Sequence, residues 1–289
     1  MKQQGSNRHH FILSQEEARH LPEGQPYIAY VCYSDWLDGG HSTLMHCHDD
    51  LAEVLLVLQG HGRYTVDLRC QEVMAGDIIL CKGGALHDEF PQTNEPYQTL
   101  CVGIGNLALP GLPPHCLVES RSDPLFHRPE QFDDLKQLFC QIDRYAAERE
   151  AGYQVLCQHL MLASLELVKR MVNGRKDAFL PPETSIFSQI AKYIDQHYAE
   201  EISIEQLVKL FYISPYHLSH MFKQKTGYSV KQYILRRRIG EAQIRLVNTQ
   251  DSVQAISEAV GFEDASYFSR IFSKYIGFTP TEYRKYRIE

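Results

Sequence analysis

Two histidines separated by a single residue, His46 and His48, have a spacing that suits ligand or metal chemistry. In an extended segment both imidazoles point to one face while Cys47 points to the other. Glu53 follows five residues later, and His87 closes a second glycine-rich segment. Imidazoles with one carboxylate suit a divalent transition metal such as Mn, Fe, Ni or Zn. The same polar groups can also hold an organic ligand, and a purely structural histidine cluster is the third interpretation.

The last hundred residues contain an internal repeat. Residues 202–229 match residues 252–279 with an offset of 49 in the first half and 50 in the second. The matched positions include apolar, helix-capping and glycine residues, among them Leu207/Ile256, Ser214/Asp264, Phe222/Phe272 and Gly227/Gly277. Agreement over this length indicates two copies of one structural unit.

Each copy predicts two helices joined by a tight turn. The first helices are expected at 204–211 and 253–260, with apolar residues three and four apart. Ser214 and Asp264 are N-cap residues for the second helices, which glycines end. Such a pair, with a polar outer face on its second helix, is a helix-turn-helix. A helix over 230–247 joins the two copies and fixes their separation.

The outward positions of the two second helices are the candidate DNA contacts. They are Tyr216, His217, Ser219, His220 and Lys223 in the first copy, and Ala265, Ser266, Ser269, Arg270, Ser273 and Lys274 in the second. Arg270 can bond guanine O6 and N7 together, while Lys223 and Lys274 suit phosphate contacts. For Arg236, Arg237 and Arg238 on the connecting helix, a solvated charged face and a DNA backbone contact are both open.

The pattern of the N-terminal half predicts short strands. Runs at 27–33, 53–58, 63–68 and 77–81 are punctuated by Gly and His, which predicts a small antiparallel barrel or sandwich. Residues 106–128, with four prolines, read as loop.

Helices are expected to follow the strands. A stripe of Phe132, Leu135, Phe139, Ile142 and Ala146 predicts a helix that either covers the barrel or pairs with its copy in a dimer. A second helix is expected at about 152–172, and residues 173–185 have the composition of a linker.

Charge divides the chain unevenly. Of the 29 Lys/Arg and 36 Asp/Glu, residues 186–289 carry 14 and 11, so a net basic tail follows an acidic body. A basic segment suits a polyanionic partner. With no apolar run long enough for a membrane span and no signal-like N-terminus, the chain is expected in the cytoplasm.

The second repeat, GFEDASYFSRIFSKYIGFTPTEYR, resembles the signature of the AraC/XylS family of bacterial regulators, and the similarity covers about 188–287. It implies that the second helix of each unit reads the major groove, and that the protein is a dimeric activator answering to a small molecule. His220 departs from the arginine usual there, which leaves the base preference of the first unit open.

Residues 40–60 and 76–87 resemble the two cupin motifs. In metal cupins two histidines, a glutamate and another histidine converge inside the barrel, so the resemblance implies a site made of His46, His48, Glu53 and His87. Lys82 and Pro91 depart from the usual Pro and Asn of the second motif. Many AraC-type sensors keep part of this set and bind sugars.

These observations predict an α+β fold: an N-terminal cupin-like β-barrel followed by helices, and a C-terminal all-α domain with two helix-turn-helix motifs. The expected boundaries are 1–128 for the sensor, with 1–25 as a candidate arm, 129–172 for a helical dimerisation or packing region, 173–185 for the linker and 186–289 for the DNA-binding domain.

The predicted function is a sequence-specific transcription activator, not an enzyme, that responds to a sugar or related metabolite in the barrel. Expected partners are double-stranded DNA, the effector, RNA polymerase and a second copy of the chain. One alternative is a metal-responsive regulator using His46, His48, Glu53 and His87. The other is a metal-dependent cupin enzyme fused to a DNA-binding domain, which ligand turnover with Fe or Mn would identify.

Overall fold

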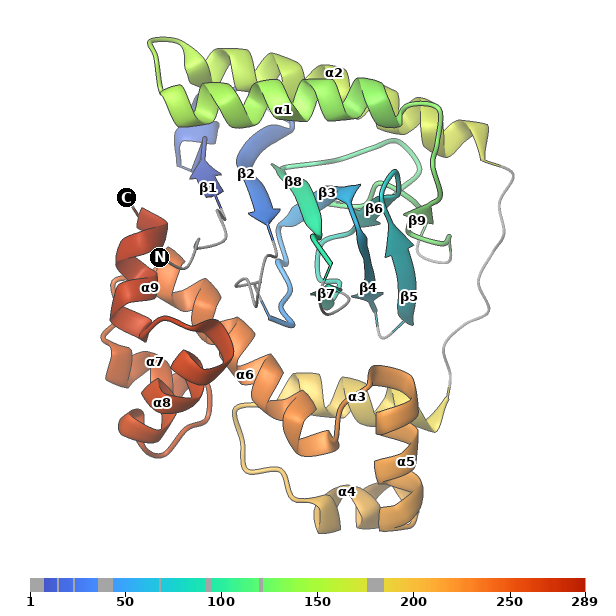
Figure 1. Ribbon diagram of the computed structural model, residues 1–289, viewed down its shortest axis with the longest axis vertical. Helices are drawn as coiled ribbons and strands as arrows, with labels where there is room; N and C mark the ends of the chain where they lie inside the picture. The colour runs from blue at the N-terminus through green and yellow to red at the C-terminus, as the bar shows by residue number, and fades with distance from the viewer. Residues whose placement is uncertain are drawn as a thin grey trace.

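The computed structural model describes residues 8–14, 16–22, 24–35, 44–67, 69–91, 95–119, 122–175 and 185–288. Its strands are β1 (Arg8–Phe11), β2 (Tyr27–Asp35), β3 (Leu51–Gln59), β4 (His61–Val66), β5 (Arg69–Met74), β6 (Ile78–Cys81), β7 (His87–Pro91), β8 (Gln98–Gly105) and β9 (Leu125–Phe126). Its helices are α1 (Phe132–Glu148), α2 (Tyr153–Gly174), α3 (Ile186–His197), α4 (Ile204–Phe211), α5 (Pro215–Thr226), α6 (Val230–Asn248), α7 (Val253–Ala259), α8 (Ala265–Ile276) and α9 (Pro280–Ile288), with a short 3₁₀ turn at Glu17–His20. Figure 1 shows the barrel between the α1–α2 pair and the C-terminal helices.

Two antiparallel sheets form the barrel. The larger runs β1-β2-β8-β3-β6-β9 and the smaller β5-β4-β7. Side chains alternate along β3: Leu55 and Val57 face the barrel interior, while Val54 and Leu56 pack toward α1 and α2. Because both faces are covered, β3 is apolar along most of its length. A bridge between His46 and His87 ties the segment before β3 to β7.

Helix α1 turns its predicted apolar stripe inward. Leu135, Phe139, Ile142 and Ala146 are fully buried in one core with α2 and the larger sheet. The structure therefore uses this stripe to cover the barrel within the chain.

Helices α3–α9 form two small cores at the ends of α6. One core gathers α3, α4, α5 and the start of α6, and the other gathers the end of α6 with α7, α8 and α9. The predicted caps are present: the Ser214 hydroxyl accepts a hydrogen bond from the His217 amide, and Asp264 accepts one from the Ser266 amide. Gly227 and Gly277 end α5 and α8 in the left-handed conformation. The repeat thus folds as the two helix-turn-helix units expected.

The four predicted strands coincide with β2, β3, β4 and β6, whereas β1, β5, β7 and β8 were not predicted. The loop expected at 106–128 has no regular element except β9. Within the candidate arm, residues 8–11 form an edge strand on β2, and residues 1–7, 15 and 23 lie outside the described part. Most of the expected linker, residues 176–184, also lies outside it. Among the described residues, no helix is long and apolar enough to cross a bilayer.

Candidate functional site

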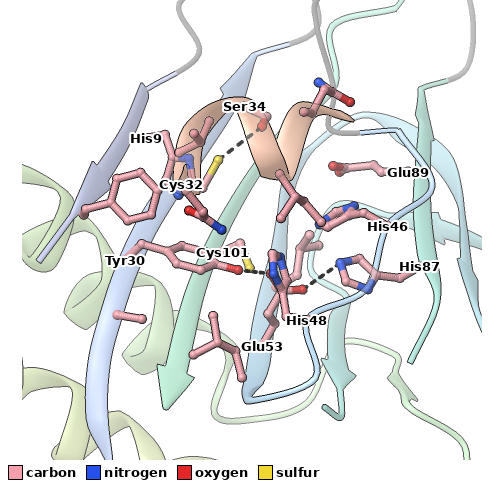
Figure 2. A pocket seen from close by; sticks show the side chains of 18 of the residues that line it. His9, Tyr30, Cys32, Ser34, His46, His48, Glu53, His87, Glu89 and Cys101 are labelled. Atoms are coloured by element: carbon pink, nitrogen blue, oxygen red, sulfur yellow. Dashed lines mark hydrogen bonds and ion pairs between the residues drawn. The ribbon is translucent and has the colours of Figure 1, made fainter. Parts of the chain in front are cut away.

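The structure brings His46, His48, Glu53 and His87 together, and we call them the His–Glu cluster. One ligand atom from each lies within 4.8 Å of all the others. His87 Nε2 is 2.9 Å from one Glu53 oxygen, and His48 Nε2 is 3.8 Å from the other. Figure 2 shows the four side chains converging on the pocket from different segments. Residues far apart in the sequence thus form one polar centre.

Three segments position the cluster. Glu53 points inward from β3, and His87 begins β7. The segment before β3 carries His46 and His48; it is not a regular strand, but backbone hydrogen bonds between His46 and His87 hold it extended. The rings of His46 and His48 therefore share one face, with centroids 4.9 Å apart, as their spacing predicted.

Two backbone carbonyls orient the buried imidazoles. His46 Nδ1 is 3.0 Å from the Leu44 carbonyl oxygen, and His87 Nδ1 is 3.0 Å from that of Ala85. A carbonyl can only accept, so each Nδ1 carries the hydrogen. Burial lowers the pKa of His46 and keeps its ring neutral, so its Nε2 is left with a lone pair for the cluster. Metal-binding histidines are commonly fixed in this way.

Burial and neighbouring charges set the ionisation of the cluster. Burial lowers the pKa of His46, and the nearby imidazoles lower it further; burial also lowers the pKa of His48. Burial would raise the pKa of Glu53, but His87 and its neighbours outweigh that effect and lower the pKa, so the carboxylate stays ionised. The Tyr30 hydroxyl also donates to Glu53. Burial would lower the pKa of His87, but the Glu53 carboxylate outweighs that effect and raises it, so His87 Nε2 also carries a hydrogen toward Glu53. With that proton displaced, three imidazoles and one carboxylate are a donor set that fits a divalent transition metal.

The cluster faces a pocket of about 480 Å³ that two parts of the chain share. The barrel and β1 contribute residues such as His9, Tyr30 and Glu89, and α6 and α9 contribute Gln243 and Tyr283 among others. In Figure 2 part of a C-terminal helix crosses the pocket near the strands. We call this the interdomain pocket. Among the described residues that line it, four are Asp or Glu and none is Lys or Arg.

The segments that carry the cluster also contact α6. The Leu44 amide donates to Gln243 at 2.8 Å. At Gly240 of α6, an added Cβ would lie 2.2 Å from the Met45 carbonyl oxygen, so only glycine permits this approach. Asp88, next to His87, accepts two hydrogen bonds of 3.1 Å from Arg236. A shift of the segment before β3 or of β7 would therefore change contacts with α6, the helix that joins the two helix-turn-helix units.

Two of the three arginines of α6 contradict both interpretations made from the sequence. Arg236 and Arg237 are buried, at 8% and 5% exposure, and so form neither a solvated face nor a DNA contact. Arg238 donates to the backbone carbonyls of Tyr198, Glu200 and Gly261. The physical reason is that α6 packs on the barrel and between two cores, which the local pattern does not reveal.

The candidate DNA contacts lie on the outer surfaces of α5 and α8, at opposite ends of α6 (Figure 1). Those that are exposed are Tyr216, His217, Ser219, His220, Lys223, Ser266, Arg270 and Lys274, and those half-buried are Ala265, Ser269 and Ser273. Tyr216 stacks on His220, with ring centroids 6.0 Å apart, and the Arg270 guanidinium lies over Tyr267. All eleven positions are thus outside the cores.

Sequence reasoning missed the shared wall of the pocket. Gln243 and Asp88 carry no motif, and Tyr283, although part of the AraC-type signature, was not assigned to the pocket; a glutamine such as Gln243 at 1% exposure is unusual in a core. Tyr30 was missed because a tyrosine in a strand is ordinary. No spacing relates Gln243, Asp88 or Tyr30 to the His–Glu cluster.

Comparison with known proteins agrees with the two halves. A cupin domain model matches residues 36–103, and a helix-turn-helix domain model matches residues 207–286. The chain is 34% identical over 264 residues to the Msm operon regulatory protein of Streptococcus mutans, covering 87% of this chain and 90% of the relative.

Two Escherichia coli proteins are also similar. An uncharacterized HTH-type transcriptional regulator, YdiP, is 26% identical over 268 residues, which cover 90% of this chain and 86% of YdiP. The arabinose operon regulatory protein is 32% identical over 162 residues, which cover 55% of this chain and 54% of that protein. Two of these relatives are named as operon regulatory proteins and one as a transcriptional regulator.

Proposed function

This chain belongs to the AraC family of DNA-binding transcriptional regulators, and we propose that a small molecule in the interdomain pocket controls it. One observation carries the proposal: barrel residues and α6 residues line the same pocket. A molecule bound there contacts both the sensor and the helix that joins the two helix-turn-helix units. Such a ligand has unequal affinity for arrangements in which these parts are docked or separated, as linkage requires.

The chemistry of the pocket favours a neutral polar effector, a sugar or related metabolite. Carboxylates without a described Lys or Arg among the lining residues repel anions. Glu53 is engaged by the cluster, Asp88 by Arg236, and Glu89 by hydrogen bonds with Thr99 and Tyr97, which leaves Asp50 to accept hydrogen bonds from hydroxyl groups. The aromatic rings in the wall can cover the apolar faces of such a molecule.

A metal-responsive regulator is the second candidate, and the His–Glu cluster favours it. The Leu44 and Ala85 carbonyls hold Nδ1 of His46 and His87, which directs their Nε2 atoms into the cluster, and Glu53 supplies the charge. His46, His48, Glu53 and His87 would hold Mn, Fe, Ni or Zn. When bound, the metal would supply a Lewis-acid centre for oxygen atoms of an effector.

For DNA recognition we assign Arg270 to a guanine and Lys223 and Lys274 to phosphates. The first unit reads its bases with Tyr216, Ser219 and His220. With α6 as a rigid connector, the two recognition helices enter successive major-groove segments roughly 34 Å apart. For this role we propose a cytoplasmic protein that is not an enzyme.

A homodimer and an activating contact with RNA polymerase complete the proposal. The stripe of α1 is already covered, so α2 is the better dimerisation surface: Val155 and Leu156 are 59% and 48% exposed. We keep 1–128 as the sensor, 129–172 as the packing and dimerisation helices, 173–185 as the linker and 186–289 as the DNA-binding domain.

The test combines ligand binding with DNA binding. Neutral sugars and polyols are titrated calorimetrically into the full chain, with and without EDTA, and each binder is then added to a DNA-affinity assay on a selected operator. Saturable binding that changes operator affinity supports effector control. Chelation alone changing operator affinity favours the metal-responsive regulator, while turnover of the ligand would contradict the non-enzymatic assignment.

A further inference from the structure

The repeat places a tyrosine in the first unit where the second unit has a glycine. Tyr212 and Gly261 occupy the matching position after the first helix of each unit, and both have left-handed backbones, with φ of 53° and 88°. In the second unit an added Cβ would lie 2.4 Å from the Ala199 carbonyl oxygen, so glycine is required. In the first unit the side chain at this position extends into solvent.

The conformation of Tyr212 is strained, and packing does not offset the strain. A bulky L-residue in the left-handed region is strained. The residue is also 94% exposed, so burial does not offset the strain. The backbone bond from its amide to Val208 would form equally well with glycine or asparagine here. Strain kept without a gain in packing points to a role for the side chain outside the fold.

The surroundings of Tyr212 point to DNA as the partner. It lies two residues before Ser214, the N-cap of α5, and four residues before Tyr216, which is 78% exposed and stacks on His220. Helices α4 and α5 carry three lysines and one glutamate, so the surface is basic. In a helix-turn-helix the first helix crosses the DNA backbone and the start of the second enters the groove. A residue between them therefore lies at the edge of the groove.

The dimensions agree with a backbone contact. Four residues span at most about 14 Å, and the major groove is about 12 Å wide. With Tyr216 in the groove, the side chain of Tyr212 can reach the flanking phosphates.

We propose that Tyr212 is an additional DNA contact, whose hydroxyl donates to a backbone phosphate beside the groove read by α5. It anchors the unit that has no arginine among its candidate contacts. This inference rests on the proposed DNA-binding role of α5.

The test compares Tyr212→Gly, which copies the second repeat, and Tyr212→Phe with the wild-type full chain. We expect Tyr212→Gly to raise the melting temperature, because the strain is relieved, and to weaken binding about threefold to tenfold. The loss should be equal on operator and unrelated DNA, with the same salt slope, because a tyrosine releases no counterion. Tyr212→Phe should lose as much affinity without the rise in melting temperature.

Arg149→Gly is the matched control, because Arg149 is another exposed residue with a left-handed backbone, at the turn after α1. It should gain stability and keep its DNA affinity. Tyr212→Gly or Tyr212→Phe binding DNA as tightly as wild type would overturn the inference. So would a loss seen only in transcription with RNA polymerase, which would indicate a protein contact. Failure of the wild type to bind any duplex in a salt-dependent way would instead refute the proposed function.

Discussion

Asp88 of the barrel and Arg236 of the connecting helix form a buried, two-point ion pair. Arg236 Nε and Nη2 each lie 3.1 Å from a different Asp88 oxygen, and the guanidinium also lies over the rings of Phe90 and Tyr228. Because Asp88 follows His87 directly, the pair links the His–Glu cluster to α6. It is one of the contacts through which a bound effector can influence the DNA-binding half.

Removing one partner of this pair should cost more than removing both. Asp88→Leu leaves a buried guanidinium unpaired and should lower the free energy of unfolding by about 3–5 kcal/mol. The double variant Asp88→Leu/Arg236→Met replaces the pair with apolar side chains and should recover most of that loss. Urea unfolding of the wild type, Asp88→Leu, Arg236→Met and the double variant measures the interaction energy between Asp88 and Arg236. Additive losses would show that the two groups do not interact.

Substitution at Gly240 should separate the barrel from α6. The new Cβ of Gly240→Ala would clash with the Met45 carbonyl, although alanine favours the helix itself. We expect faster proteolysis between the two halves and weaker effector binding, since one wall of the pocket moves away. Gly174→Ala on α2, where an added Cβ meets no atom within 4 Å, is the control and should leave both unchanged. Unchanged proteolysis of Gly240→Ala would contradict the docked arrangement.

Two carboxyl groups of the same pocket should differ in metal binding. Glu53→Gln removes the charged donor of the cluster and should weaken Ni²⁺ or Mn²⁺ binding by at least about 100-fold, more than outer-shell changes usually do. Glu89→Gln changes a pocket carboxyl outside the cluster and should leave metal affinity near wild type. Titration calorimetry on the chelator-treated protein measures both. Equal losses would show that the cluster is not the metal site.

Arg270 and Lys274 should contribute to DNA binding in different ways. Arg270→Ala should cost about 1–3 kcal/mol on the preferred operator and relax the preference at one base pair. Lys274→Ala should weaken binding to all sequences and reduce the salt slope by about one. Binding-site selection followed by salt titration separates the two. If selection with Arg270→Ala returns the wild-type operator unchanged, the base-reading role is wrong.

Asp195 should make stability depend on pH. Burial raises the pKa of Asp195 to about 7, although Arg237 and the Tyr233 hydroxyl oppose the rise. Between about pH 4 and pH 7 the carboxyl is ionised when unfolded but protonated when folded. Its contribution to stability therefore falls as the pH rises through this window, and is constant above it.

Asp195→Asn should remove this dependence. The unfolding free energy of the variant minus that of the wild type should increase from pH 4 to pH 7 and then level off. A difference that stays flat across that window would show that Asp195 titrates normally in the folded protein.

Much of the candidate site followed from patterns confined to short stretches. About thirty consecutive residues are enough to predict a helix-turn-helix, because its caps, apolar spacing and terminal glycines are local requirements. The two copies reinforced each other, so α4, α5, α7 and α8 were predicted nearly to their ends. The spacing of His46, His48 and Glu53 together with the cupin resemblance likewise identified a set whose ligand atoms the fold brings within 4.8 Å of one another.

What the sequence by itself determined, then, was the content of each unit and which surfaces carry polar side chains. Only the tertiary structure decided how the units meet, because those contacts join residues with no local relationship. Asp88 and Arg236 are 148 positions apart, and Leu44 and Gln243 are 199 apart. A run of three arginines looks the same in sequence whether it is solvated or buried. Contacts with Asp88 and Cys47 accompany the burial of Arg236 and Arg237, because α6 packs on the barrel.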